Sequence, residues 1–268
     1  MSRRANGRLS TRVGQALHGE NQFFGHAVGA ELLGRVGLTD LTALAITGRL
    51  PSAEQRQLLE EIATVLSSAD PRIWLFKTTR LGACYGGMIA GAVTGMLCLH
   101  RALVGHMTAS DAAALLVELV ARLPDPGNEK EVAAVITERL ATSKRLIGFG
   151  VPFRPQDERA VQLEARLRAR GWTERRHYRA LLAVSSFLRQ SRAVEPNLGG
   201  CLAAALLDAG FAPDRIGPLV LALGQHTFLA NAVEGAEQSP EILQRFPDEW
   251  VEYRGAPRRA SPRARGTE

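Results

Sequence analysis

The sequence predicts an all-α fold, and three observations support this prediction. Aromatic residues make up only 6% of the 268 residues, whereas alanine and leucine abound, a composition typical of helical proteins. Apolar residues recur at helical spacing between turns rich in glycine and proline. No alternating pattern is long enough to predict a strand. The length allows one large domain, or a large and a small one.

Two helices are predicted between residues 39 and 66. Thr39 or Asp40 can cap the first, and Gly48 ends it. The run Pro51-Ser52-Ala53-Glu54 opens the second, which places apolar residues on one face: Leu58, Leu59, Ile62 and Leu66. The pattern is a helix, a tight turn and a helix.

An uncharged stretch of nineteen residues, 81–99, predicts one continuous helix. By length this stretch could cross a bilayer. Its five glycines and its polar Thr94 favour a helix buried in protein instead. Gly87, Gly91 and Gly95 recur every four residues and form a face without side chains, which predicts close approach of another helix.

The rest of the chain predicts further helices. Residues 110–142 hold two helical patterns, broken at residues 123–127. An amphipathic helix follows from Asp157 to Arg170 and ends at Gly171, and the next is anchored by Trp172 and Tyr178. A buried helix rich in alanine and leucine and a final apolar helix complete the pattern.

The net charge of +6 belongs to the two ends of the chain. Residues 1–12 carry four arginines and no acid, and residues 254–268 carry five arginines and one glutamate. We interpret residues 1–18 and 253–268 as basic tails. A nucleic-acid binder acting through these tails is the minority interpretation.

The cysteines and the N-terminus indicate the compartment. Cys84, Cys98 and Cys201 are odd in number, widely spaced and surrounded by apolar residues. This pattern favours reduced thiols in a cytoplasmic protein over disulfides or a metal site. The arginines at the start are not followed by an apolar segment, so no signal peptide is expected.

A loop at residues 144–160, rich in glycine and proline, is the first candidate for a binding site. Gly148 and Gly150 allow positive φ and close approach of a ligand, while Arg154 and Arg159 offer planar donors to carboxylates or phosphates. A plain connector between two helices, with solvated arginines, is the alternative.

Five segments resemble the citrate synthase and citryl-CoA lyase superfamily, in the family's order, between about Gly19 and Gln238. "AITGRLPS" resembles the family's "LLTGRLPT", and "LVGHMTASD" resembles "GPLHGGANE". The loop "GFGVPFRPQDERA" resembles "GFGHxxY…DPRA". "PNLGGCLAA" resembles "NVDGCIG", and "ALGQHTFLANAVEG" resembles "ARVAGWLAHWLEQ".

This resemblance implies a citrate synthase-like multi-helical fold. It has a large helical domain formed by residues 19–110 and 199–252, with a smaller inserted helical domain at residues 111–198. It also implies a homodimer in which the glycine-rich helix lies at the subunit interface. No membrane and no permanently bound cofactor are expected.

The family makes or cleaves a carbon–carbon bond between an acyl-CoA and a keto acid, so a coenzyme A thioester is the implied substrate. His106 matches the histidine that hydrogen-bonds the developing enolate. Arg159, Arg154 and Asn197 are the implied substrate-binding residues. Gly148, Phe149 and Gly150 match the loop that runs along the CoA.

Three positions depart from the family pattern. Val151 replaces a histidine, Gly199 stands where the catalytic aspartate belongs, and Gly224 or Gln225 replaces an arginine. Loss of a general base typically costs about a hundred- to ten-thousand-fold in rate. Glu158, Asp157 or His226 could substitute for the missing groups. A noncatalytic pseudoenzyme, dimerising with itself or with a citrate synthase-like paralogue, is the alternative.

Overall fold

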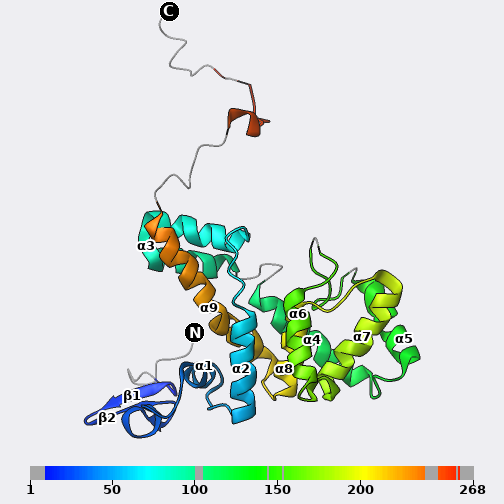
Figure 1. Ribbon diagram of the computed structural model, residues 1–268, viewed down its shortest axis with the longest axis horizontal. Coiled ribbons are helices and arrows are strands. Elements are labelled where there is room, and N and C mark those ends of the chain that lie inside the picture. The colour runs from blue at the N-terminus through cyan, green and yellow to red at the C-terminus, as the bar shows by residue number, and fades with distance from the viewer. Residues whose placement is uncertain are drawn as a thin grey trace, which may run out of the picture.

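The computed structural model describes residues 10–99, 105–143, 145–152, 154–238, 247–257 and 259. Figure 1 shows a helical body with a small sheet near its N-terminal end. Most of the arginines assigned to basic tails, in residues 1–9 and 260–268, lie outside the described residues.

A small antiparallel sheet precedes the helices. It comprises β1 (Gly14–Leu17), β2 (Glu20–Phe23) and β3 (His26–Ala27) in that spatial order, and the π-helical turn η1 (Val28–Leu32) follows. The expectation of no strand is therefore wrong here, because strands of two to four residues are too short to show an alternation. β1 also lies within the residues assigned to the N-terminal tail.

The first helical pair is α1 (Leu38–Thr47) and α2 (Ala53–Val65). α1 starts two or three residues earlier than predicted, because its N-cap is Gly37, whose N–H donates to Asp40 Oδ2 at 2.9 Å. The expected end at Gly48 is confirmed by its φ of 76°. Ser52 caps α2 in a reciprocal pair of hydrogen bonds with Gln55, so this start is also as predicted.

The helix α3 (Trp74–Leu99) corrects the prediction of one continuous glycine-rich helix. Gly87 takes φ 78° and ψ 175°, a conformation that essentially only glycine adopts, and breaks α3 into two halves. The second half packs on the first, because a Cβ on Gly91 would lie 2.5 Å from Ala83 Cβ. A Cβ on Gly95 would clash with Thr79 and Phe228.

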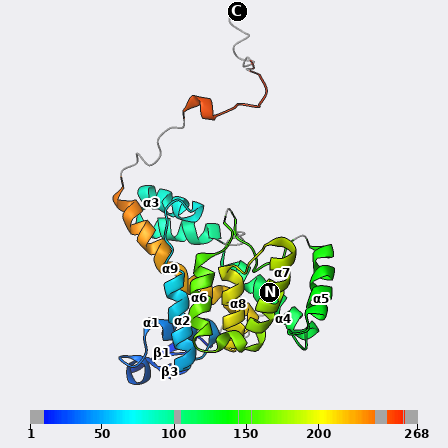
Figure 2. The same ribbon diagram turned by 45° about the vertical axis from the view of Figure 1, so that its right-hand side comes forward.

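The glycine face is therefore covered within the chain, by the first half of α3 and by α9 (Pro213–Glu237), and gives no support for a subunit contact. α3 and α9 are long and apolar enough to cross a membrane by length and composition alone. In this fold α3 is broken at Gly87 and α9 packs against it, and Figures 1 and 2 show the two helices side by side.

The remaining helices follow the predicted pattern closely. They are α4 (His106–Arg122), α5 (Glu129–Thr142), α6 (Glu158–Arg168), the 3-10 turn η2 (Trp172–Glu174), α7 (Arg176–Arg192) and α8 (Leu198–Asp208). Trp172 and Tyr178 are fully buried, as expected of anchors. A 3-10 turn, η4 (Asp248–Trp250), lies near the C-terminus. The domain limits at residues 110 and 198 fall close to the starts of α4 and α8 and stay a prediction.

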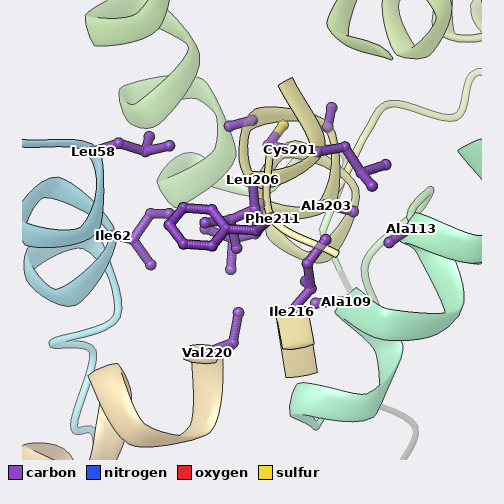
Figure 3. Close-up of a cluster of buried hydrophobic side chains, with 14 of the residues drawn as sticks. Leu58, Ile62, Ala109, Ala113, Cys201, Ala203, Leu206, Phe211, Ile216 and Val220 are labelled. Atoms are coloured by element: carbon purple, nitrogen blue, oxygen red, sulfur yellow. The ribbon is translucent and has the colours of Figure 1, made fainter. Parts of the chain in front are cut away.

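The core is built around α8, which packs against α4, α6, α7 and α9. Its small residues, Ala203 to Ala205, are fully buried and let these helices approach closely (Figure 3). Cys201 is buried in the same cluster, and this burial raises the pKa of its thiol to about 12. Such a thiol is unreactive; Cys84 and Cys98 are half-buried.

Candidate functional site

Asn197 begins α8 and fixes its first turn. Its Oδ1 accepts a hydrogen bond from the Gly200 N–H at 3.1 Å, and its Nδ2 donates to the Gly150 carbonyl at 2.8 Å. Both ends of the amide are thus used inside the protein. The structure therefore gives Asn197 a capping role, and substrate binding by this side chain stays a prediction.

The predicted CoA loop packs against this same turn. The Asn197 N–H donates to the Gly148 carbonyl, the Gly150 N–H donates to the Glu195 carbonyl at 2.7 Å, and Phe149 forms a β-bridge with Pro196. Gly148 has φ 92°, and a Cβ on it would lie 3.1 Å from Gly200 Cα. Close backbone packing therefore accounts for the glycine here, and contact with CoA stays a prediction.

Asp157 joins the start of α6 to the start of α8. Its buried carboxylate accepts four hydrogen bonds: from Arg159 N, Nε and Nη2, and from the Leu198 N–H at 3.1 Å. Burial alone would raise the pKa of Asp157, but the hydrogen bonds and positive charge of Arg159, with the Leu198 N–H, lower it. A carboxylate held in this way is a poor general base.

The two predicted substrate arginines lie beside this turn, each paired with an acid. Arg159 makes a two-point contact with Asp157, and 41% of its side chain is exposed. Arg154 pairs with Glu158 at 2.9 Å, and both are exposed. The pKa of Glu158 is lowered, first by its own backbone N–H and then by Arg154.

The first turn of α4 meets the first turn of α8 at Gly199. A Cβ on Gly199 would lie 3.3 Å from Thr108 Oγ1 and 3.2 Å from Asn197 Oδ1. Since Asp157 links α6 to the same turn, the N-termini of α4, α6 and α8 come together. We call this region, formed by Gly148, Gly150, Asp157, Asn197, Gly199 and Gly200, the helix junction. Three helix dipoles favour negative charge there.

His106 is the first residue of α4, is 9% exposed, and borders a cleft of about 290 Å³. The other described residues lining this cleft are apolar and come from the second half of α3 and from α9: Val93, Met96, Leu97 and Leu221. We call it the His106 cleft. The predicted catalytic histidine thus lies between the helix junction and an apolar wall.

The groups considered as substitutes for the missing catalytic residues lie in other settings. His226 Nε2 hydrogen-bonds Ser67 Oγ at 2.8 Å, at the end of α2. A Cβ on Gly224 would contact Leu66, also at the end of α2. Among the described residues, no group of three or more His, Cys, Asp or Glu side chains could hold a metal ion.

Comparison with known proteins identifies the fold. No protein-family model and no curated protein matches the sequence. The structure of citryl-CoA lyase from Hydrogenobacter thermophilus matches with a TM-score of 0.81 and 18% identity, covering 95% of this chain and 98% of that one. The chain has the citrate synthase-like fold.

Two longer proteins contain the same citrate synthase-like fold. ATP citrate lyase from Methanothrix soehngenii, in complex with citrate and coenzyme A, matches with a TM-score of 0.75 at 14% identity. A mutant of the Methanosaeta concilii enzyme, in complex with (3S)-citryl-CoA, matches at 0.74. This chain spans 43% of each.

Two features of the site were missed by sequence reasoning. Thr108, which faces Gly199, could have been noticed because it stands two residues after His106 in the same helical turn. The apolar walls of the His106 cleft come from α3 and α9, and the fold-back at Gly87 that presents the second half of α3 has no clear signal in the sequence.

Proposed function

We propose that this protein binds a coenzyme A thioester beside His106 and makes or cleaves a carbon–carbon bond between an acyl-CoA and a keto acid. The observation that carries the proposal is the position of His106 at the N-terminus of α4, next to the helix junction, in a fold shared with a citryl-CoA lyase. The matched ATP citrate lyases hold coenzyme A or citryl-CoA.

The electrostatics of this region suit the chemistry. An enolate beside a thioester is a high-energy anion, so it needs a hydrogen-bond donor and a favourable field in a place shielded from water. His106 is buried and can donate a hydrogen bond, and the dipole of α4 favours negative charge at its first turn. Arg159 and Arg154 are the proposed partners of the keto acid's carboxylates.

The second candidate function is a noncatalytic protein that binds the same ligand or an active paralogue. Gly199 favours it, because a glycine has no carboxylate to remove a proton. Asp157 does not replace that carboxylate, because its four hydrogen bonds and lowered pKa make it a weak base.

We further propose that the protein dimerises through α3 and α9. The large exposed apolar side chains of these helices support this: Tyr85, Met88, Ile89, Val93, Leu97, Leu229 and Val233. Soluble monomers rarely leave such surfaces open. The wild-type protein should sediment as a dimer and the Val233→Glu variant as a monomer. Equal sedimentation coefficients for the two proteins would contradict this proposal.

Calorimetry with CoA and acetyl-CoA tests ligand binding. We expect saturable binding that His106→Ala weakens for acetyl-CoA, while His226→Ala, on α9 beside the end of α2, matches wild type. Absence of binding at millimolar ligand contradicts the proposed function.

Proton exchange separates the two candidates. An active enzyme should exchange the methyl protons of acetyl-CoA for deuterium in D₂O, a reaction that NMR follows directly. Exchange of these protons by the wild-type protein supports the catalytic candidate. Wild type that binds without exchanging, together with a Gly199→Asp variant that gains exchange, supports the noncatalytic candidate.

A further inference from the structure

The segment around η4 carries large apolar side chains that its own chain leaves exposed. Trp250 is 71% exposed, Val251 66% and Tyr253 76%. The segment nevertheless has local order, since the Val251 N–H donates to the Asp248 carbonyl at 3.2 Å and the Tyr253 hydroxyl donates to the Ala256 carbonyl at 3.1 Å. We call residues 247–254 the C-terminal arm. Figure 1 shows this arm standing clear of the helical body.

The arm has the pattern of an extended segment with one covered face. Val251, which follows η4, has extended backbone with φ −116° and ψ 103°. Apolar and charged residues alternate from this point, as Val251, Glu252, Tyr253 and Arg254, a pattern typical of a half-buried strand. Glu252 and Arg254 pair with each other at 2.6 Å, which places both charges on one side. The pattern therefore predicts that Val251 and Tyr253 face an apolar surface.

A groove near the N-terminus offers such a surface. It has a volume of about 680 Å³ and lies between β2, η1 and the start of α1. At roughly 30 Å³ for a group of the size of a water molecule, the side chains of one tryptophan and one tyrosine would occupy much of it. Leu33 and Leu38 are 77% and 74% exposed. We call it the N-terminal groove, and its lining includes Phe23, Val28, Leu33, Leu38 and Leu41.

The helix α9 separates the two surfaces within one chain. Ala43 of α1 and Ile216 of α9 belong to one cluster, so the groove lies near the start of α9, whereas the arm follows its last residue, Glu237. Figures 1 and 2 show the sheet and the arm beyond opposite ends of this helix. α9 has 25 residues and is about 37 Å long. Residues 238–247 span at most about 35 Å, so an arm that turned back along its own α9 would need nearly all of this length.

A second copy brings an arm and a groove together with less chain. A twofold axis perpendicular to α9 near its last turns makes the two copies of α9 antiparallel, so each arm continues along the partner's α9 toward the partner's α1. Leu229 and Val233, which belong to the proposed dimer contact, are exposed in these last turns. The exchange is reciprocal: two arms fill two grooves, and the assembly closes as a dimer.

We propose that the C-terminal arm of one copy binds in the N-terminal groove of a second copy. Trp250 and Tyr253 insert against Leu33 and Leu38, while the charged side of the arm faces solvent. This inference is independent of the proposed ligand and rests on the proposed dimer. It adds a second contact, far from the exposed face of α3 and α9, so the two contacts can be tested separately.

Sedimentation over a range of concentrations provides the first test. Trp250→Ala should raise the Kd of the dimer about 30-fold, as is typical of a buried aromatic anchor. Glu252→Gln, in the same arm but on its charged side, is the matched control and should keep the wild-type Kd. Equal Kd values for wild type and Trp250→Ala overturn the inference and leave the proposed dimer standing. A wild-type protein that sediments as a monomer overturns both.

Thermal denaturation excludes a general loss of structure. In the Val233→Glu background, which we expect to be monomeric, Trp250→Ala should leave the midpoint unchanged, because Trp250 is exposed on the single chain. A lower midpoint in this background means that Trp250 packs on its own chain, and it overturns the inference.

A variant of the groove tests where the arm binds. Leu38→Ala should raise the dimer Kd about tenfold, and combining it with Trp250→Ala should raise the Kd by less than the product of the two effects, because both remove one contact. Leu17→Ala is the matched control, since Leu17 is an exposed leucine of β1 that does not line the groove. Independent effects of Leu38→Ala and Trp250→Ala overturn the inference.

Photo-crosslinking tests which copy is bound. A benzophenone side chain at position 250 should join two chains under ultraviolet light, with the link mapped by mass spectrometry to residues 23–41. The same group at position 252, on the charged side, is the control and should give far less product. A link within one chain, a link to α3 or α9 of the second copy, or no link between chains overturns the inference.

Discussion

The helix junction and the His106 cleft are adjacent, but their residues are used in opposite ways. In the junction the polar side chains of Asp157 and Asn197 are bonded within the protein, and its glycines admit neighbouring backbone. In the cleft the described walls are apolar and open. The motifs that resemble an enzyme family therefore hold the fold together at the junction, whereas the cleft next to them presents an apolar surface.

Among the variants that test this comparison, Gly200→Ala should have the largest effect on stability. A Cβ on Gly200 would overlap the Gly148 carbonyl, and backbone on both sides leaves no side chain to move. We expect a loss of about 3 kcal/mol or more in the free energy of unfolding, measured by urea denaturation. Gly199→Ala is the control, because its Cβ would lie 3.2 Å from Asn197 Oδ1 and 3.3 Å from Thr108 Oγ1, and these side-chain atoms need to shift by only a few tenths of an ångström. Equal losses for the two variants would contradict the tight packing of the junction.

Asp157→Asn should have the second-largest effect and lower the free energy of unfolding by about 2 to 4 kcal/mol. It removes the buried charge that pairs with Arg159, and it weakens the cap of α6. The pKa of Asp157 is lowered in the fold from its usual value near 3.8. Its contribution is therefore complete above that value and is lost as the pH falls through the native pKa.

The pH profile of stability measures this effect. The wild-type advantage over Asp157→Asn should shrink in acid, whereas Glu158→Gln, at an exposed neighbour, should follow the wild-type curve. An advantage of wild type that stays constant down to pH 2 would show that the carboxylate's charge is not what stabilises the junction.

Asn197→Ala should lower the free energy of unfolding by about 1 to 2 kcal/mol, since it removes the cap of α8 and the hydrogen bond to the Gly150 carbonyl. Asn197→Asp keeps the acceptor and should recover part of the loss in thermal denaturation. If Asn197→Ala instead leaves stability unchanged and abolishes ligand binding, Asn197 belongs to the ligand site and the contrast between the two regions fails.

Most helices could be predicted because their signals are local. Ser52 with Gln55, and Gly48 and Gly171 with positive φ, mark helix ends that the sequence states directly. Two features could not be predicted for physical reasons. The stretch contains several glycines, and any of them could break the helix. Tertiary packing, which the local sequence does not encode, selects Gly87 as the position of the break. The His106 cleft joins residues more than a hundred positions apart, and no local pattern records that contact.

Leu97→Gln should have the smallest effect on stability and thereby sharpen the comparison from the side of the cleft. Leu97 is 70% exposed, so its replacement should change the free energy of unfolding by about 0.5 kcal/mol or less. Leu99→Gln is the matched control: Leu99 is buried against Phe76 and Phe228, so the same substitution two residues away should destabilise the protein by about 2 to 4 kcal/mol. Leu97→Gln should nevertheless shift the sedimentation of the protein toward that of a monomer, because a polar amide replaces part of the apolar surface proposed for the dimer contact. A Leu97→Gln protein as unstable as Leu99→Gln would mean that the cleft is part of the packed core and not a surface exposed on the single chain.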